Sequence, residues 1–265
     1  MPFHPRLIEP VDIMLPGLPS DLDGLRIAHV SDLHVHGVRR RHDRLIRQLA
    51  ATPFDLLVLT GDYMSNQGQE PAAFNVLEKL CTHAVPAHGV YGVFGNHDTH
   101  VLRRMSSPLP IHWLDNKAMT LPGLPLDLLG FGFLDCGWAD TLATLAHWNG
   151  DPRSADRARI LLCHYPSCLP VAADLGVHLM LSGHTHGGQC RLPGRLALIN
   201  SSDLPLRLTC GVLRHQETLC VVSRGLGEVK LPIRLLCPRQ IPLLTLRRGP
   251  LLGVETPHIK AVRRW

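Results

Sequence analysis

The sequence predicts an α/β protein built on two packed β-sheets, the first of them largely parallel. Short apolar runs alternate with helical patterns in the first half of the chain. Several of these runs end in a polar cluster, as strands of parallel sheets do where a ligand binds. The second half changes to hairpin-like pairs of strands, and a mixed second sheet packed on the first accounts for that change.

The first half reads as successive βαβ units. Apolar runs of strand length predict strands, and apolar residues at helical spacing predict helices between them. Pro71 is tolerated because it falls in the first turn of its helix. The expected strands are Leu25–Val30, Asp55–Leu59 and Gly89–Phe94, and the expected helices are Arg40–Ala51 and Pro71–Thr82.

The second half repeats this pattern less regularly. The expected elements are strands at Leu126–Leu134, Arg159–Cys163 and Val177–Leu181, a helix at Thr141–Trp148, and late strands at Thr209–Leu213, Thr218–Ser223 and Ile241–Leu246. No clear linker interrupts the chain, so we expect one domain over residues 1–265, with a C-terminal hairpin region at 205–248 and a tail at 249–265.

Composition excludes several classes of protein. The chain is 45% hydrophobic and 18% charged, which is typical of a globular protein, and its net charge of +5 favours an anionic partner without demanding nucleic acid. No apolar stretch is long enough to span a membrane, and the first residues lack the features of a signal peptide. Eight cysteines form no C-x-x-C pair, which favours reduced thiols and a cytoplasmic location.

Five polar clusters follow predicted strands directly. They are Ser31-Asp32-Leu33-His34, Thr60-Gly61-Asp62, Gly95-Asn96-His97-Asp98, Cys163-His164-Tyr165-Pro166, and the run from Ser182 to Gly188 that contains His184 and His186. Carboxylate oxygens and imidazole nitrogens are the ligands that Mn, Zn and Fe accept. Neighbouring glycines allow the sharp turns by which such side chains converge. The clusters therefore predict a metal site at one edge of the sheets.

This series of clusters resembles the calcineurin-like metallophosphoesterase superfamily. The chain supplies D-x-H, G-D, G-N-H-D, a lone His and G-H-x-H in the order of that superfamily, across residues 32–186. The resemblance implies a four-layer αββα sandwich of two mixed sheets flanked by helices. It also implies a hydrolase of phosphate esters that holds two divalent cations, for which we expect Mn, with Zn, Fe or Mg as alternatives.

Carried over by position, the resemblance divides the ligands between two metals. Asp32, His34 and His186 would hold one cation and Asn96, His164 and His184 the other, with Asp62 bridging both. A hydroxide between two cations would attack phosphorus. His97 would donate a proton to the leaving oxygen, with Asp98 orienting and charging it as a carboxylate–imidazole dyad.

A finer resemblance is to small bacterial phosphodiesterases and UDP-2,3-diacylglucosamine hydrolases that act beside membranes. It rests on Gly183–Gln189, on Ser223–Gly227 and on Pro232-Ile233-Arg234. It implies cleavage of a phosphodiester or diphosphate bond, a lipid-linked nucleotide as one candidate substrate, and peripheral contact with the inner face of a membrane. Members of that branch tend to have an acidic residue after the late Cys/Pro stretch, whereas this chain reads Cys237-Pro238-Arg239-Gln240-Ile241. Arg39, Arg40 and Arg41 are candidates to meet a second phosphate of the substrate.

Two alternatives stay open at this point. One is a phosphomonoesterase or nuclease on the same metal core, although 265 residues leave little room for an added DNA-binding segment. The other is a scaffold of this fold that binds partner proteins without catalysis. Scaffolds of that kind typically lose metal ligands or the histidine dyad, and here the whole set is present.

Overall fold

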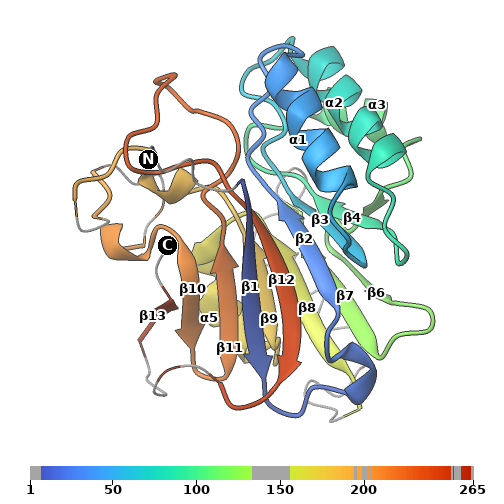
Figure 1. Cartoon of the computed structure of the whole chain (residues 1–265), viewed down its shortest axis with the longest axis vertical. Coiled ribbons are helices and arrows are strands. Elements are labelled where there is room, and N and C mark those ends of the chain that lie inside the picture. The colour runs from blue at the N-terminus through green and yellow to red at the C-terminus, as the bar shows by residue number, and fades with distance from the viewer. Residues whose placement is uncertain are drawn as a thin grey trace.

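Two mixed β-sheets lie face to face in the computed structural model, with helices on their outer surfaces (Figure 1). The structure describes residues 7–132, 156–193, 196–198, 202, 204–251, 253 and 258–263. The strand order is β1-β12-β2-β3-β4-β5 in the first sheet and β13-β10-β11-β9-β8-β7-β6 in the second. The expected sandwich of two mixed sheets is confirmed.

Each strand expected from the sequence is present with similar bounds, whereas β1, β5, β6 and β13 were not predicted. The first sheet contains β1 (Ile8–Leu15), β2 (Arg26–Val30), β3 (Leu56–Thr60), β4 (Val90–Val93), β5 (His112–Trp113) and β12 (Ile241–Arg248). The second contains β6 (Lys117–Thr120), β7 (Leu126–Phe131), β8 (Ala158–Cys163), β9 (Leu179–Ser182), β10 (Gly211–His215), β11 (Thr218–Val222) and β13 (Lys260–Arg263).

Parallel pairing brings the carboxyl ends of the central strands to one edge of the molecule. In the first sheet β2, β3 and β4 pair in parallel, with Val30 beside Leu59 and Thr60 beside Val93. In the second sheet β8 and β9 pair in parallel, and β11 runs parallel to β9. Because parallel strands end on the same side, the loops that follow them meet there.

The main core fills the space between the sheets. Along each strand, alternate side chains point into this core. Ile27, Leu56 and Val58 face this core, whereas Ala28 and Leu57 face the helices on the other side of the first sheet. Residues alternate between the faces of a strand, so a strand buried on both faces reads as a continuous apolar run. This is why the central strands were visible in the sequence.

Helices cover the outer face of each sheet. On the first sheet lie α1 (Arg40–Ala50), α2 (Glu70–His83) and α3 (His100–Ser106), and α5 (Leu169–Asp174) packs on the second. The two longer helices were predicted to within about two residues, whereas the expected helix at Thr141–Trp148 lies outside the described residues. No helix in the described part of the chain combines the length and the apolar character needed to cross a bilayer.

Strand β1 was missed by the sequence analysis. It pairs in parallel with β12 and buries Val11, Ile13 and Leu15 in a period of two. Pro10 interrupts the segment, and proline argues against a central strand because it lacks a backbone donor. The strand lies at the edge of its sheet, where proline is tolerated.

Candidate metal centre

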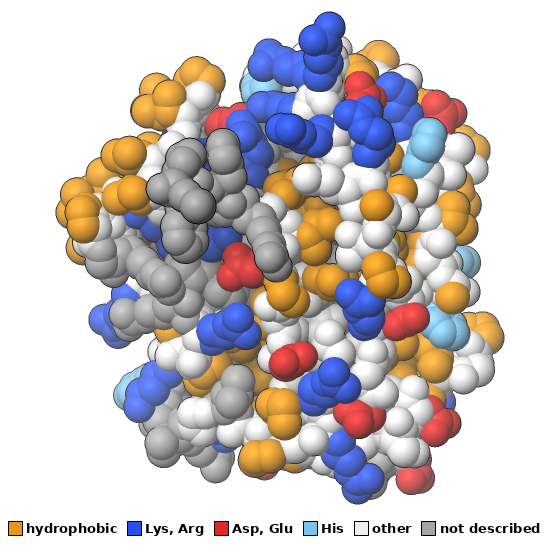
Figure 2. Space-filling view, in the orientation of Figure 1, with side chains coloured by type: hydrophobic (Ala, Val, Ile, Leu, Met, Phe, Trp, Pro, Cys, Tyr) orange, Lys and Arg blue, Asp and Glu red, His pale blue; other side chains and the backbone are white. Residues whose placement is uncertain are grey.

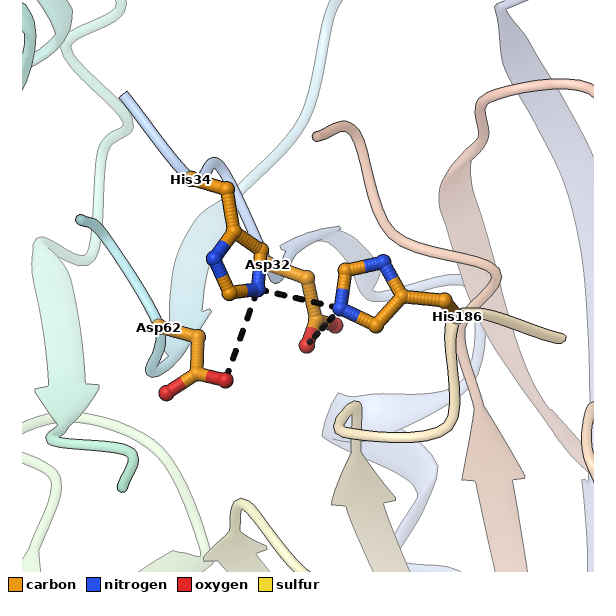
Figure 3. Close-up of side chains that lie close together, drawn as sticks. All are labelled: Asp32, His34, Asp62 and His186. Atoms are coloured by element: carbon orange, nitrogen blue, oxygen red, sulfur yellow. Dashed lines mark hydrogen bonds and ion pairs between the residues drawn. The ribbon is translucent and has the colours of Figure 1, made fainter. Parts of the chain in front are cut away.

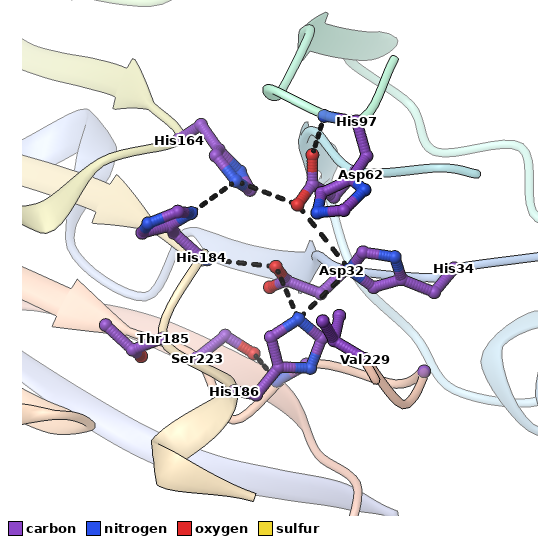
Figure 4. Close-up of polar contacts among 12 residues, drawn as sticks. Asp32, His34, Asp62, His97, His164, His184, Thr185, His186, Ser223 and Val229 are labelled. Atoms are coloured by element: carbon purple, nitrogen blue, oxygen red, sulfur yellow. Dashed lines mark hydrogen bonds and ion pairs between the residues drawn. The ribbon is translucent and has the colours of Figure 1, made fainter. Parts of the chain in front are cut away.

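The loops that follow five parallel strands converge at the carboxyl edge shared by both sheets. Figure 4 shows the side chains of Asp32, Asp62 and His97 from the first sheet facing those of His164 and His184 from the second. Residues more than a hundred positions apart in the sequence thereby come into direct contact. The predicted clusters are therefore neighbours in space.

Asp32, His34, Asp62 and His186 form the first group, and all four are buried (Figure 3). The Nε2 atom of His34 lies 3.0 Å from Nε2 of His186 and 3.5 Å from Oδ2 of Asp62. The Nε2 atom of His186 lies 3.5 Å from Oδ1 of Asp32. One potential ligand atom from each of the four residues lies within 4.8 Å of the other three. Atoms at this spacing can all bind the same cation.

Asp62, His164 and His184 form the second group, with ligand atoms also within 4.8 Å of one another. Oδ2 of Asp62 lies 3.1 Å from Nε2 of His164, and that nitrogen lies 3.2 Å from Nδ1 of His184. Asp62 therefore belongs to both groups, as a carboxylate shared by two cations must.

The donor set fits a metal in its chemistry as well as its spacing. Nδ1 of His164 lies 2.7 Å from the carbonyl oxygen of Thr60, so Nδ1 carries a proton and Nε2 is the ring atom turned toward Asp62, where a cation would replace its proton. Oδ2 of Asp32 is buried without a hydrogen-bond partner in the described part of the chain. A buried carboxylate oxygen without a partner is costly, and a cation would satisfy it.

Electrostatics within the centre favour opposite charges on Asp62 and His164. Burial alone would disfavour the charged form of each group, but their mutual attraction outweighs it. The pKa of Asp62 is lowered and the pKa of His164 is raised to about 10. Burial also lowers the pKa of His34, helped by the nearby His186, which keeps that imidazole neutral and able to bind a cation.

The backbone of the centre is held in a conformation that few residues adopt. Asp32, His34, Asp62, His184 and His186 all have φ between 42° and 70°. Left-handed backbone costs a residue other than glycine about 1–3 kcal/mol when the surroundings impose it, and it concentrates at functional sites. Five of the seven predicted ligands share this feature, which indicates that the fold holds their side chains in place at the expense of stability.

Glycines of the motifs make room for the carboxylates. A Cβ atom on Gly183 would overlap Oγ of Ser31 and Oδ2 of Asp32. A Cβ atom on Gly95 would overlap Oδ1 of Asp62. Both glycines are therefore required by close approach to a carboxylate.

Asp98 has partners other than the one predicted. Its Oδ2 accepts hydrogen bonds from the backbone N–H groups of Asp62 at 2.9 Å and Gly95 at 2.8 Å, and its Oδ1 accepts one from Tyr63 at 2.8 Å. The expected contact with His97 is not the one that forms. The reason is geometric, because backbone donors of two adjacent loops already surround the carboxylate. Asp98 ties the loop after β3 to the loop after β4.

Ser65, which the sequence analysis missed, contacts both His97 and His34. Its carbonyl oxygen lies 2.8 Å from Nδ1 of His97, and its Oγ lies 3.0 Å from Nδ1 of His34. The backbone N–H of His97 also donates to Oδ1 of Asp62 at 2.9 Å (Figure 4). Ser65 follows Asp62 by three residues, and that proximity was the only sequence signal for it.

The remaining candidates lie further out. Asn96 is exposed on the loop after β4, so its assignment as a ligand stays a prediction. Arg39 and Arg40 are exposed, whereas Nη1 of Arg41 lies 2.9 Å from Oε2 of Glu228. Of the three arginines, Arg41 is therefore the one held toward the interior.

The position of Gln240 has a local explanation. Gln240 is fully buried, and its Nε2 donates to Oε2 of Glu9 at 3.0 Å. The same Glu9 oxygen lies 2.8 Å from Nη2 of Arg224. Gln240 and Arg224 are therefore both joined to β1 through Glu9.

Comparisons with known proteins agree with this geometry. Residues 25–188 match the Calcineurin-like phosphoesterase family. The metallophosphoesterase YkuE of Bacillus subtilis is 30% identical over 261 residues, covering 92% of this chain and 87% of YkuE. The phosphodiesterase YaeI of Escherichia coli is 29% identical over 206 residues, which cover 72% of this chain and 70% of YaeI. The solved structure of TT1561 from Thermus thermophilus aligns with a TM-score of 0.51 at 15% identity, covering 77% of this chain and 90% of TT1561, and shows the same fold.

Replacing Asp98 with alanine should destabilise the protein and not only the centre. Three buried backbone donors would lose their acceptor, and the free energy of unfolding should fall by about 3 kcal/mol or more. Urea denaturation followed by circular dichroism measures the change. Asp98→Asn keeps one acceptor oxygen and should recover part of the loss. An Asp98→Ala protein as stable as the parent would contradict this role.

Gly183→Ala should displace Asp32 and weaken Mn²⁺ binding about tenfold or more, as disturbance around a ligand commonly does. Isothermal titration calorimetry measures the affinity. Gly37→Ala is the matched control, because a Cβ atom there meets nothing within 4 Å. Equal Mn²⁺ affinities for both variants would argue against the close-packing explanation.

Proposed function

This chain belongs to the calcineurin-like phosphoesterase family, and we propose that it cleaves a phosphodiester or diphosphate bond at a centre of two divalent cations. A hydrolase acting on phosphoric esters follows from the family and its fold. The single observation that carries the two-cation proposal is the place of Asp62 in both groups of ligands. The described ligand positions, all occupied by donors, speak against a scaffold that has lost catalysis.

The proposed division of ligands assigns Asp32, His34 and His186 to one cation. Asn96, His164 and His184 complete the other, with Asp62 shared. When bound, the cations supply Lewis acidity, which lowers the pKa of water and neutralises charge on the phosphate. We favour Mn, because a mixed set of nitrogen and oxygen ligands suits it, and Zn, Fe and Mg are the alternatives to be tested.

His97 is the proposed proton donor to the leaving oxygen. A carbonyl oxygen only accepts hydrogen bonds, so the contact with Ser65 requires a proton on Nδ1 of His97. Nε2 is then the atom that exchanges a proton with the substrate. In this proposal Ser65 orients the ring, and Asp98 acts indirectly by holding the loop that carries it.

Several features support a diester or diphosphate over a monoester. The relative YaeI is named a phosphodiesterase. Arg41, on the helix after the first metal loop, gives a second phosphate a cationic neighbour, with Arg39 and Arg40 exposed beside it. A lipid-linked nucleotide such as UDP-2,3-diacylglucosamine is the finer candidate. We place this activity in the cytoplasm, in one domain over residues 1–265.

Metal dependence is the first test of the proposal. Protein stripped with a chelator should not hydrolyse bis(p-nitrophenyl) phosphate, and Mn²⁺ should restore turnover. Asp62→Ala should lose most of its bound metal and its activity together, because one side chain serves both groups. Asp12→Ala, on an exposed carboxylate of β1, is the control. Turnover by Asp62→Ala at the parent rate, or by the stripped protein, would refute the proposal.

His97→Ala should keep its metal content and lose turnover by about 10²–10⁴-fold on substrates with poor leaving groups. The loss should be smaller on p-nitrophenyl esters, since nitrophenolate leaves with little need of a proton. Comparing kcat for the two classes of ester, with metal measured by atomic emission, separates proton donation from ligand loss. Equal losses on both classes would assign His97 another role.

A further inference from the structure

Exposed aliphatic side chains gather on two neighbouring segments beside the metal centre. Eleven large hydrophobic side chains are exposed in the described part of the chain, and seven of them lie within residues 190–198 and 231–236. They are Leu192, Leu196, Leu198, Leu231, Ile233, Leu235 and Leu236. The two segments are hydrogen-bonded neighbours, and exposed apolar side chains gathered on neighbouring backbone are a feature of interaction sites. We call this set the aliphatic patch.

The two segments form one supported structure. The N–H of Arg191 donates to the carbonyl of Leu235 at 2.9 Å, and the N–H of Leu235 donates to the carbonyl of Gln189 at 3.1 Å. The side-chain amide of Gln189 donates to the carbonyls of Val229 at 3.1 Å and Leu231 at 2.8 Å. Gln189 follows the last metal loop directly, so the aliphatic patch is tied to the ligand His186 by a few residues of backbone.

Cationic residues border the aliphatic patch. Lys230 and Arg239 are exposed on the same segment, while its one acidic residue, Glu228, is buried. Across from them, the exposed Arg39 directly precedes α1, and the exposed Arg40 is the first residue of that helix. Figure 2 shows hydrophobic side chains at the upper left and Lys and Arg side chains at the top over α1. Apolar and cationic groups thus project from the same end of the molecule.

A cavity of about 710 Å³ lies between α1 and the segment 226–239. Its cationic lining consists of Arg41, Arg44, Arg234 and Arg239, and Leu7, Leu33 and Leu45 contribute to its apolar lining. Glu228 lies near three of these arginines, so the arginines outnumber their carboxylate partner. The cavity therefore combines excess positive charge with apolar side chains. This combination suits a phosphate group that is attached to a hydrocarbon chain.

We propose that this end of the molecule docks on a bilayer that contains anionic phospholipid, with the aliphatic patch inserted among the acyl chains and a lipid phosphate in the arginine-lined cavity. The segment after β11 reaches beyond the ends of the sheets (Figure 1), a convex shape that suits insertion. Protein interfaces favour aromatic residues at their centre, and the aliphatic patch has none. Aliphatic insertion beside Lys and Arg is the established physics of peripheral binding to anionic membranes.

The docking surface goes beyond the proposed hydrolysis, and binding can be measured without activity. The full chain should sediment with vesicles of phosphatidylcholine and phosphatidylglycerol and less with phosphatidylcholine alone. Ile233→Ser with Leu236→Ser should weaken binding about tenfold or more, and Lys230→Gln with Arg44→Gln should reduce only the preference for the anionic vesicles. Val85→Ser with Val101→Ser, which removes exposed valines elsewhere, is the matched control and should bind as the parent does.

Three outcomes would overturn the docking proposal. The parent protein could stay in the supernatant with every vesicle, or the control pair could lose as much binding as the patch pair. The patch pair could also convert a dimer to a monomer in light scattering while vesicle binding is unchanged, which would assign the aliphatic patch to a second copy of the chain. Hydrolysis of soluble bis(p-nitrophenyl) phosphate by the patch pair should match the parent, which separates a failure of docking from a failure of catalysis.

Discussion

The contact that organises this molecule is the one between Asp62 and the imidazoles on either side of it. The carboxylate ends a strand of the first sheet, yet Nε2 of His164 from the second sheet lies 3.1 Å away. This pair therefore joins the two sheets at the edge where their parallel strands end. Its position fixes how closely the loops must approach, and the left-handed backbone at Asp62 and the absence of a side chain at Gly95 follow from that requirement.

Around this contact, several features that hold the side chains in position lower the stability of the fold. Positive φ at five predicted ligand positions is unfavourable, and so is the buried oxygen of Asp32, which has no hydrogen-bond partner in the described part of the chain. Backbone hydrogen bonds and a large core offset them, since more than twenty buried residues fill the space between the sheets. Cations would relieve the electrostatic part of this cost, so metal binding and stability should be linked.

The sequence was sufficient to predict which loops meet at this edge, but not the contacts that their side chains make. The ligand loops could be predicted because each directly follows an apolar run, and parallel strands must end at one edge. The partner of Asp98 could not, because it depends on which of several nearby donors lies within about 3 Å after folding. β1 was missed because Pro10 masks its alternation, although proline is harmless at a sheet edge.

Apolar runs in the sequence also did not distinguish buried segments from exposed ones. Residues 231–236 are as hydrophobic in sequence as a buried strand, and only the structure shows that they project outward. Arg234 within this run turns the other way, with its guanidinium reaching carbonyl groups of Gly227 and Cys237. Alternation of inward and outward side chains is a property of the backbone path, which hydropathy alone does not give.

The place of β12 has a consequence for how the protein is made. This strand comes late in the sequence, yet it lies between β1 and β2, which leave the ribosome long before it. β1 and β2 stay without this partner while the strands of the second sheet from β6 to β11 are synthesised. Sequence-distant pairing of this kind slows folding and leaves strand edges exposed meanwhile. One edge of β2 therefore stays open to other strands until residues 241–248 have been made.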